Sequence, residues 1–284
     1  MKRYLGLSEL KIFTHRVRSF YRNARYYINH IAFDRSAKNK LRQIKDSKNN
    51  QKAFVFGNGP SLQKLSKSKV KKYMKEEGYD LFATNSYLYA DISDELAPSH
   101  YLLSDPNWFE PSKADFEEEF RDEIRTTLDN LEKIKPKLFI PFHEKDRKLP
   151  TETYYFNDSE NLFSDNVTNL LQPRGYNSKG GRKALAIASY MGYEKIYMCG
   201  IDLSQFKELR VDQENNVYME YTHFFENREK TFREHFSRSM GHQLYNFHWS
   251  FKTLEKFSHL PIVNLDPEGL VDVFPKRHEL DVYK

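Results

Sequence analysis

The chain has 284 residues, enough for one large domain or two modest ones, and 39% of them are hydrophobic. Its formal net charge of +5 is too small for a strongly basic nucleic-acid-binding protein, so we expect no nucleic-acid partner. Cys199 is the one cysteine, which excludes an intrachain disulfide and fits a reducing compartment. No run reaches the roughly 20 apolar residues of a membrane helix, so the sequence predicts a cytoplasmic protein.

The first 50 residues form a basic extension, and we expect the body to span residues 51–284. Residues 1–50 hold 13 Lys and Arg against three acidic residues. Apolar and basic residues interleave there, which predicts helix, and the polar stretch 36–52 predicts a linker. Such an extension could rest on the cytoplasmic face of an anionic inner membrane. It could equally pack on the body or on a second subunit of a homo-oligomer, and both interpretations stay open.

Short apolar runs in the body predict six strands. They lie at residues 53–56, 80–84, 101–103, 137–140, 195–199 and 261–265. Helical stretches separate most of them, at residues 64–77, 111–131 and 241–258 and within 176–192, where residues 177–181 predict the loop that leads into the helix and Gly192 its end. Alternation of strand and helix with short links predicts a mainly parallel sheet, and therefore a Rossmann-like α/β domain. Residues 144–175 are polar and indicate no element.

Residues 203–240 interrupt this alternation. They are polar, charged and aromatic, and they indicate neither a strand nor a long apolar helix. Long insertions in compact domains are usually functional or disordered. Because this one follows a central strand, we expect a lid over a site. The helix after it places Leu244, Phe247, Trp249, Phe251, Leu254 and Phe257 at a spacing that predicts burial.

A glycine-rich turn follows the first strand. Gly57 and Gly59 permit backbone angles that other residues resist, Pro60 fixes its own φ angle, and Ser61 is a candidate helix cap. A strand that ends in such a turn can direct free N–H groups, including that of Asn58, at an anion. An ordinary connection between a strand and a helix would have the same pattern.

Polar residues follow four of the predicted strands. They are Asn58, Asn85, Asp105 and Asp202. In open α/β sheets, ligands bind outside the carboxyl ends of the strands. The sequence therefore predicts a binding crevice there without naming its ligand.

Four segments occur in the order found in bacterial sialyltransferases of glycosyltransferase family 42, and the body resembles that family between residues 53 and about 274. The segments are Gly57-Asn58-Gly59-Pro60-Ser61-Leu62; Asn85 after a strand; Ala186-Ile187-Ala188 with Gly192-Tyr193-Glu194-Lys195-Ile196-Tyr197 and Gly200-Ile201-Asp202; and Gly241-His242. The resemblance implies a variant GT-A fold that transfers a CMP-activated acidic sugar with inversion and without a metal. The sugar would be sialic acid, a related nonulosonate or Kdo. The acceptor would be a hydroxyl of a bacterial capsule, lipooligosaccharide or O-antigen.

The resemblance also implies residue roles. His242 would be the general base, since an imidazole titrates near neutral pH. The donor nucleotide-sugar would be held by Gly57, Asn58, Gly59, Pro60, Ser61, Asn85, Asp105, Lys179, Gly180, Gly181, Asp202, Tyr218 and Tyr221. Three positions depart from the family pattern: Asp105-Pro106 replaces Asn-Pro, Lys179-Gly180-Gly181 replaces Thr-Ser-Gly, and Ser204 stands where the family has a tyrosine. Tyr218, Tyr221 or a cation such as Lys179, Arg228 or Arg233 could replace that phenol.

Two alternatives remain. The body also looks similar to archaeal hydroxymethyldihydropterin pyrophosphokinases, which share the Gly-x-Gly-Pro-Ser-Leu turn and an acidic segment after the third strand. That reaction would need ATP and Mg²⁺, with Asp105 and Asp202 as candidate metal ligands. The second alternative is a non-catalytic nucleotide- or glycan-binding scaffold on the membrane. Histidine spacing predicts no protein-bound metal site, because His242 and His248 are six residues apart.

Overall fold

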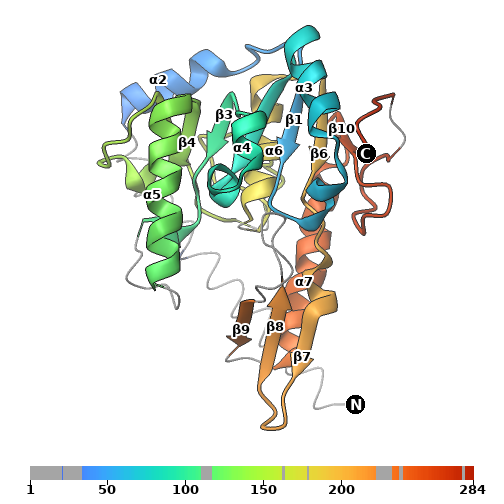
Figure 1. Cartoon of the computed structure of the whole chain (residues 1–284). Helices are drawn as coiled ribbons and strands as arrows, with labels where there is room; N and C mark the ends of the chain where they lie inside the picture. Colours follow the sequence, from blue (N-terminus) through green and yellow to red (C-terminus); the bar gives the residue numbers. More distant parts are fainter. Residues whose placement is uncertain are drawn as a thin grey trace.

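The computed structural model describes residue 21 and residues 34–109, 117–161, 164–177, 179–221, 232–236, 239–276 and 279–284. Its centre is a parallel seven-stranded sheet with the order β10-β6-β1-β2-β3-β4-β5 (Figure 1). The strands are β1 (Lys52–Phe56), β2 (Asp80–Thr84), β3 (His100–Leu102), β4 (Lys137–Pro141), β5 (Thr153–Phe156), β6 (Lys195–Cys199) and β10 (Ile262–Asn264). The predicted mainly parallel, Rossmann-like α/β sheet is thereby confirmed.

Helices cover both faces of this sheet. The helices are α2 (Arg35–Ile44), α3 (Lys67–Glu76), α4 (Ile92–Glu95), α5 (Glu117–Ile134), α6 (Gly180–Met191) and α7 (Met240–Leu254). Side chains alternate along β1, so Ala53 and Val55 join the core under α6 and α2, whereas Phe54 and Phe56 join the core under α3 and α5. The result is a three-layer α/β/α body.

The connections place a topological switch between β1 and β6. From β1 the chain moves outward through β2, β3, β4 and β5, and α6 then returns it to β6 on the other side of β1. Ligands of open α/β sheets commonly bind near such a switch point, outside the carboxyl ends of the strands. The loops after β1 and β6 are two of the four strand-end loops that the sequence predicts to border a ligand.

The segment predicted to lack strands contains a second sheet. Strands β7 (Leu209–Val211), β8 (Val217–Tyr221) and β9 (Phe232–Phe236) form an antiparallel three-stranded sheet, which projects from the body beside α7 (Figure 1). Among its described side chains, Leu209, Val217 and Met219 are buried, and Phe206, Phe236, Met240 and Phe247 pack against them. Only alternate residues of such a sheet are buried, so its strands contain no apolar run.

Two further elements were missed in the sequence. The predicted linker contains α2, whose Leu41 and Ile44 are buried against the sheet. The stretch predicted to be irregular contains the edge strand β5, in which every second residue is buried. The predicted burial of Leu244 is also wrong, since 48% of its surface is exposed, whereas Leu254 and Phe257 are fully buried as predicted.

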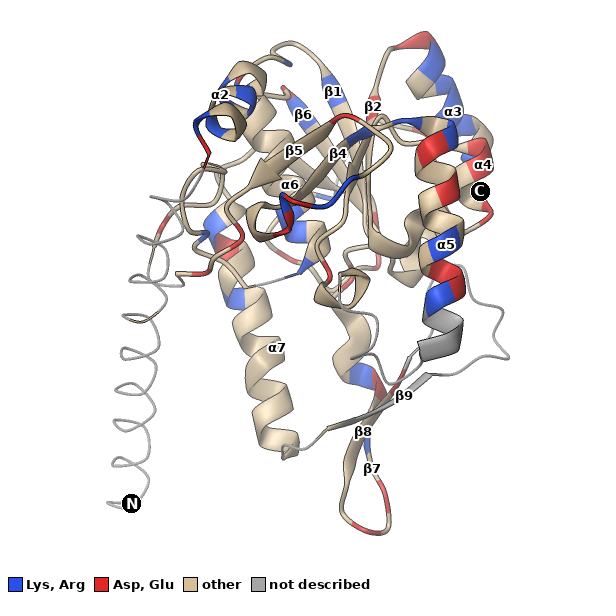
Figure 2. Ribbon diagram, turned by 90° about the vertical axis from the view of Figure 1, so that its left-hand side faces the viewer, with Lys and Arg blue, Asp and Glu red and all other residues tan. Residues whose placement is uncertain are grey.

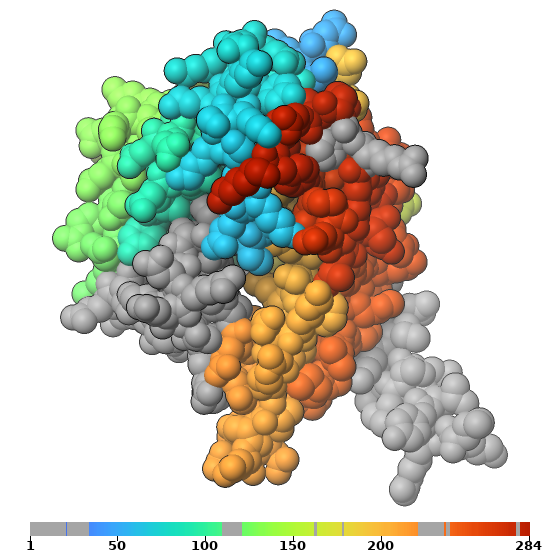
Figure 3. Space-filling model, turned by 45° about the vertical axis from the view of Figure 1, so that its right-hand side comes forward, coloured from blue at the N-terminus to red at the C-terminus, as the bar shows by residue number. Residues whose placement is uncertain are grey.

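The carboxyl-terminal segment lies across the α3 side of the body, where Figure 3 shows it in red against the blue and cyan surface. The Ser66 N–H donates to the carbonyl of Val282, and the Lys284 N–H donates to that of Lys64. Within the described part of the chain, none of the helices has the length and apolarity needed to cross a membrane. The predicted division at residue 50 and the predicted membrane contact of residues 1–50 remain predictions, and most of residues 1–33 lie outside the described residues.

Candidate functional site

The glycine turn after β1 packs directly on the loop after β6. The N–H of Gly57 donates to the carbonyl of Cys199 (2.9 Å), and that of Gly59 donates to the carbonyl of Gly200 (2.9 Å). A Cβ atom on Gly57 would overlap the Gly200 carbonyl, and one on Gly59 would overlap the Asp202 carboxylate. Glycine is therefore required here for contact between two protein loops.

Ser61 and Asp202 hold the two loops together. The Ser61 N–H donates to Asp202 Oδ2 (2.9 Å), and the Ser61 hydroxyl donates to Asp202 Oδ1 (2.5 Å). The Gly200 N–H in turn donates to Ser61 Oγ (2.8 Å). Ser61 is thus not the predicted helix cap: it lies inside the short helix η1 (Pro60–Lys64), and Asp202 from the neighbouring loop accepts its N–H. The N–H groups of Gly57, Gly59 and Ser61 all donate within the protein, contrary to the expected set of free donors.

Asp202 is a partly buried carboxylate near a second one, Asp266. Burial raises its pKa, the Ser61 hydrogen bonds oppose that rise, and the nearby charge of Asp266 adds to it. Asp266 follows β10, the neighbour of β6, and pairs with Lys64 (3.0 Å). Asp202 has no such cationic partner at hydrogen-bonding distance in the described chain, so it is the carboxylate at the switch point whose charge is least balanced.

Polar side chains also join the loops after β1, β2 and β3. Asn58 Nδ2 donates to the Thr84 carbonyl (3.1 Å), and the Ser104 N–H donates to Asn85 Oδ1 (3.2 Å). Asn58 Oδ1 and Ser104 Oγ are buried without a hydrogen-bond partner among the described residues. Unpaired buried polar atoms are uncommon in folded proteins and often mark a place where a ligand, ion or water binds. Asp105 accepts the Asn107 N–H at the start of a short helix (3.0 Å).

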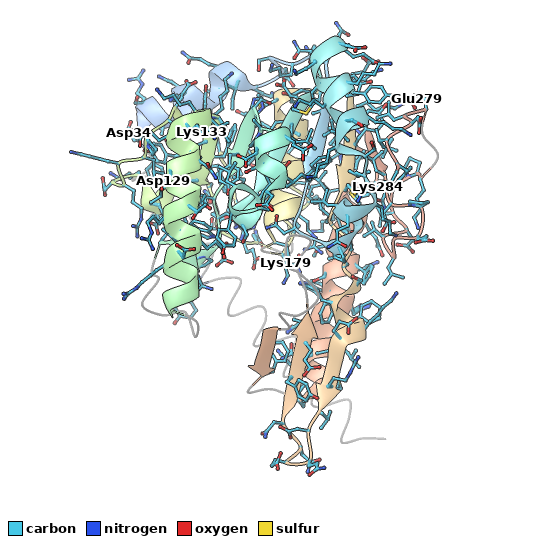
Figure 4. All side chains as sticks on the ribbon, viewed as in Figure 1. Asp34, Asp129, Lys133, Lys179, Glu279 and Lys284 are labelled. Carbon is cyan, nitrogen blue, oxygen red and sulfur yellow. The ribbon has the colours of Figure 1, made fainter. Side chains whose placement is uncertain are left out.

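The first turn of α6 lies over this edge of the sheet. A Cβ atom on Gly180 would be 3.1 Å from Asn85 Nδ2, and one on Gly181 would be 2.7 Å from the Ile201 side chain. Lys179 precedes the helix at its N-cap, and Figure 4 shows it on the side of the body from which α7 and the small sheet project. The helix therefore directs its positive end at the carboxyl ends of β2 and β6.

Three buried cations lie in and beside this turn, and sequence reasoning missed them. Lys183 pairs with Asp158 (2.9 Å), and Arg174 pairs with the same carboxylate (2.5 Å). Arg182 donates to the Ser250 carbonyl of α7 (2.9 Å), while its Nε and Nη1 have no hydrogen-bond partner in the described residues. Burial lowers the pKa of Arg182 to about 10. The sequence did hold one signal for these cations. Arg182 and Lys183 are consecutive charged residues in an otherwise apolar helix, and charged side chains in a buried helix need polar partners within the protein.

The predicted base His242 lies in a different part of the molecule. It is in the first turn of α7, a helix with a single Lys and no acidic residue, which Figure 2 shows as almost entirely tan. At 1.5 Å per residue, His242 lies about 12 Å along the helix from Ser250, which contacts α6. Its neighbours Met240 and Phe247 pack on the small sheet, which also carries Tyr218. The side chains of Tyr221 and Arg233, and all of Arg228, lie outside the described residues.

The strand order separates the two predicted metal ligands. Asp105 follows β3 and Asp202 follows β6, with β1 and β2 between them. Three strand spacings of about 4.8 Å place these loops roughly 14 Å apart, too far for one ion. In the described part of the chain, no group of three or more His, Cys, Asp or Glu side chains could hold a metal ion.

The family comparison agrees with one of the two alternatives raised by the sequence. The model of a family described as 6-hydroxymethylpterin diphosphokinase MptE-like matches residues 23–208, which include every strand from β1 to β6 and the loop containing Asp202. No curated protein matches the chain.

This match overturns the main functional interpretation of the sequence. A CMP-sugar glycosyltransferase of the sialyltransferase type, acting on a bacterial surface glycan, is not supported, and neither are its donor and acceptor. The error has a clear source, because a glycine turn after the first strand and a Gly-Ile-Asp after a late strand serve loop packing here and do not identify a nucleotide. The chain belongs to the MptE-like family, whose model is described as 6-hydroxymethylpterin diphosphokinase MptE-like.

Proposed function

We propose that this protein transfers a diphosphate group from ATP to the hydroxymethyl group of a pterin. The alcohol oxygen forms a bond to the β-phosphorus of ATP, the bond between that phosphorus and the α-β bridging oxygen breaks, and AMP leaves. The hydroxyl proton is released. The match to the diphosphokinase-like family, across the sheet that carries the crevice, is the observation that supports this proposal.

The switch point between β1 and β6 is the proposed location of the nucleotide. It is bordered by the loop containing Asn58, the loop containing Asp202, and the first turn of α6 with Gly180 and Gly181. A helix amino terminus favours phosphate through its free N–H groups and dipole. Glycines at the start of α6 leave its backbone uncovered by side chains of its own.

Magnesium would enter this site together with the nucleotide. Mg²⁺ is commonly held by one or two carboxylates plus substrate phosphates and water. The donors at the edge fit that mode: Asp158 and Asp266 are neutralised by cations, which leaves Asp202 as the carboxylate at the switch point. The ion would neutralise phosphate charge. This proposal replaces the expectation of a metal-independent reaction, which belonged to the sugar-transfer interpretation.

The test measures AMP formed from ATP in the presence of 6-hydroxymethylpterin and Mg²⁺. Asp202→Asn should reduce AMP formation at least about 100-fold, since it removes the charge at the switch point. Asp281→Asn is the matched control. Asp281 lies on the carboxyl-terminal segment, where it is exposed and pairs with Lys69 of α3, so this variant should keep full activity.

Because the Asp202→Asn substitution could also disturb the packing of Ser61, the melting temperature of each variant is measured in parallel. Ser61→Ala provides a second variant that keeps the carboxylate and loses one of its two hydrogen bonds. Pterin-dependent AMP formation that is equal in wild type and in a folded Asp202→Asn variant would contradict the role of Asp202. No pterin-dependent AMP formation by the wild type would contradict the proposed function.

A further inference from the structure

Lys183 lies at the inner end of the proposed crevice, where the loops after β3 and β5 meet α6. It is in the first turn of that helix, and only 2% of the side chain is exposed. Its ammonium nitrogen is 2.9 Å from the Asp158 carboxylate and 3.5 Å from the Ser104 carbonyl oxygen. The ammonium therefore lies between a strand-end loop of the edge and the segment that follows β5.

Ser104 contacts both Lys183 and Asn85, the side chain beside the first turn of α6. Its N–H donates to Asn85 Oδ1, and Asn85 Nδ2 is the atom nearest to the missing Cβ of Gly180. Ser104 is 5% exposed, and its hydroxyl has no hydrogen-bond partner in the part of the chain that the structure describes. A buried hydroxyl that neither donates nor accepts costs free energy unless something else pairs with it. The helix amino terminus, the unpaired hydroxyl and a buried ammonium thus lie together.

The charges around Lys183 do not balance. Arg174, Arg182 and Lys183 are each 6% exposed or less. Among the described residues, Asp158 and Glu160 pair with Arg174 and Lys183, whereas Arg182, from the same turn of α6, has no acidic partner at ion-pair distance. One positive charge is therefore in excess in a poorly solvated place, and isolated buried charge is strongly unfavourable. An anionic ligand at this point would balance it.

Asp158 pairs with two cations and would keep one of them if Lys183 moved away. Arg174 donates both to its carboxylate and to its main-chain oxygen, so Asp158 would stay paired if Lys183 turned away. Lysine has a long flexible stem that lets its ammonium move between partners. The Asp158 carboxylate occupies the position relative to Lys183 that a phosphate oxygen would take.

We infer that Lys183, together with the Ser104 hydroxyl and the first turn of α6, forms the polyphosphate-binding part of the crevice, and that Asp158 is the internal anion which a bound phosphate displaces. This inference rests on the proposed function, since it places the phosphates of the donor. Lys183, Ser104 and Asp158 were not among the site residues predicted from the sequence.

The test is calorimetric binding of inorganic triphosphate and of ATP with Mg²⁺, which requires no pterin and no turnover. Lys183→Met should weaken binding of both about 10- to 100-fold, the usual effect of losing a charge-assisted contact. Asp158→Asn should strengthen it, because the competing carboxylate charge is gone while its main-chain oxygen still binds Arg174. Lys195→Met is the control, since Lys195 pairs with Glu279 near the start of β6, away from the carboxyl edge.

The two variants should change affinity in opposite directions. If the Lys183–Asp158 pair served only to hold the fold, both substitutions would weaken binding. Melting temperatures identify any variant that fails to fold, and in that case the sign of the Asp158→Asn effect decides. Unchanged triphosphate affinity in Lys183→Met, or weaker affinity in folded Asp158→Asn, would overturn the assignment and leave the proposed function standing. Failure of the wild type to bind either probe would overturn both.

Discussion

The buried histidine at the start of β3 makes this protein sensitive to mild acid. His100 is 2% exposed, stacks on Phe82 at 4.3 Å between ring centroids, and shares a hydrogen bond with Ser99 Oγ (2.9 Å). Burial lowers its pKa from 6.5 to about 4, and the positive charges of Lys137 and Lys48 add to that effect while Asp80 opposes it. The folded protein therefore keeps this ring neutral.

The sign of the effect on stability follows from proton binding. Between pH 6.5 and about 4 the unfolded chain binds a proton at His100 that the folded chain does not, so stability falls as the pH falls through this window. Above the window both states are neutral and the contribution is fully present. At 1.36 kcal/mol per pH unit, the full difference amounts to about 3 kcal/mol.

The assay is urea unfolding at about pH 7 and about pH 4.5, which stays above the lowered pKa of the neighbouring Asp80 carboxyl. His100→Phe keeps an aromatic ring against Phe82 and cannot bind a proton, so its loss of stability between the two pH values should be smaller than that of the wild type by roughly 2 to 3 kcal/mol. His259→Gln alters an exposed histidine and should keep the wild-type dependence. Equal losses in wild type and His100→Phe would refute the reasoning.

Two further predictions concern packing. Gly57→Ala should lower the free energy of unfolding by several kcal/mol, because its methyl group would overlap the Gly200 carbonyl. Gly241 lies in open space in the first turn of α7, so Gly241→Ala should raise the free energy of unfolding by up to about 1 kcal/mol. Urea unfolding of both variants checks these two predictions. Cys199 is buried with its pKa raised to about 12, so it should react with a thiol reagent at pH 8 only after denaturation, and rapid labelling of the folded protein would contradict this.

The central sheet was largely predictable because its strands are short apolar runs that are buried on both faces. The bounds of β2 and β6 agree with the predicted ranges to the residue. By contrast, β5 is an edge strand and β7, β8 and β9 form a half-exposed sheet, so their sequences contain too few apolar residues to mark them. The helix α2 was hidden because only Leu41 and Ile44 in it are buried.

The candidate site was predictable only in its location. Strand-end residues Asn58, Asn85 and Asp202 do gather at the carboxyl edge, as parallel topology requires. The pairing of Lys183 with Asp158 joins residues 25 positions apart through a loop without periodicity, so no local pattern could indicate it. Asp105 was the residue that favoured the diphosphokinase alternative in the sequence, yet the strand order shows that it cannot share one ion with Asp202.

The most direct test of the proposed function is phosphorus NMR of the products formed from ATP, Mg²⁺ and 6-hydroxymethylpterin. We predict equal amounts of AMP and of a pterin product that carries two phosphorus atoms, because the β- and γ-phosphates of ATP move as one group. Formation of ADP with a pterin monophosphate, or no pterin-dependent consumption of ATP, would contradict the account.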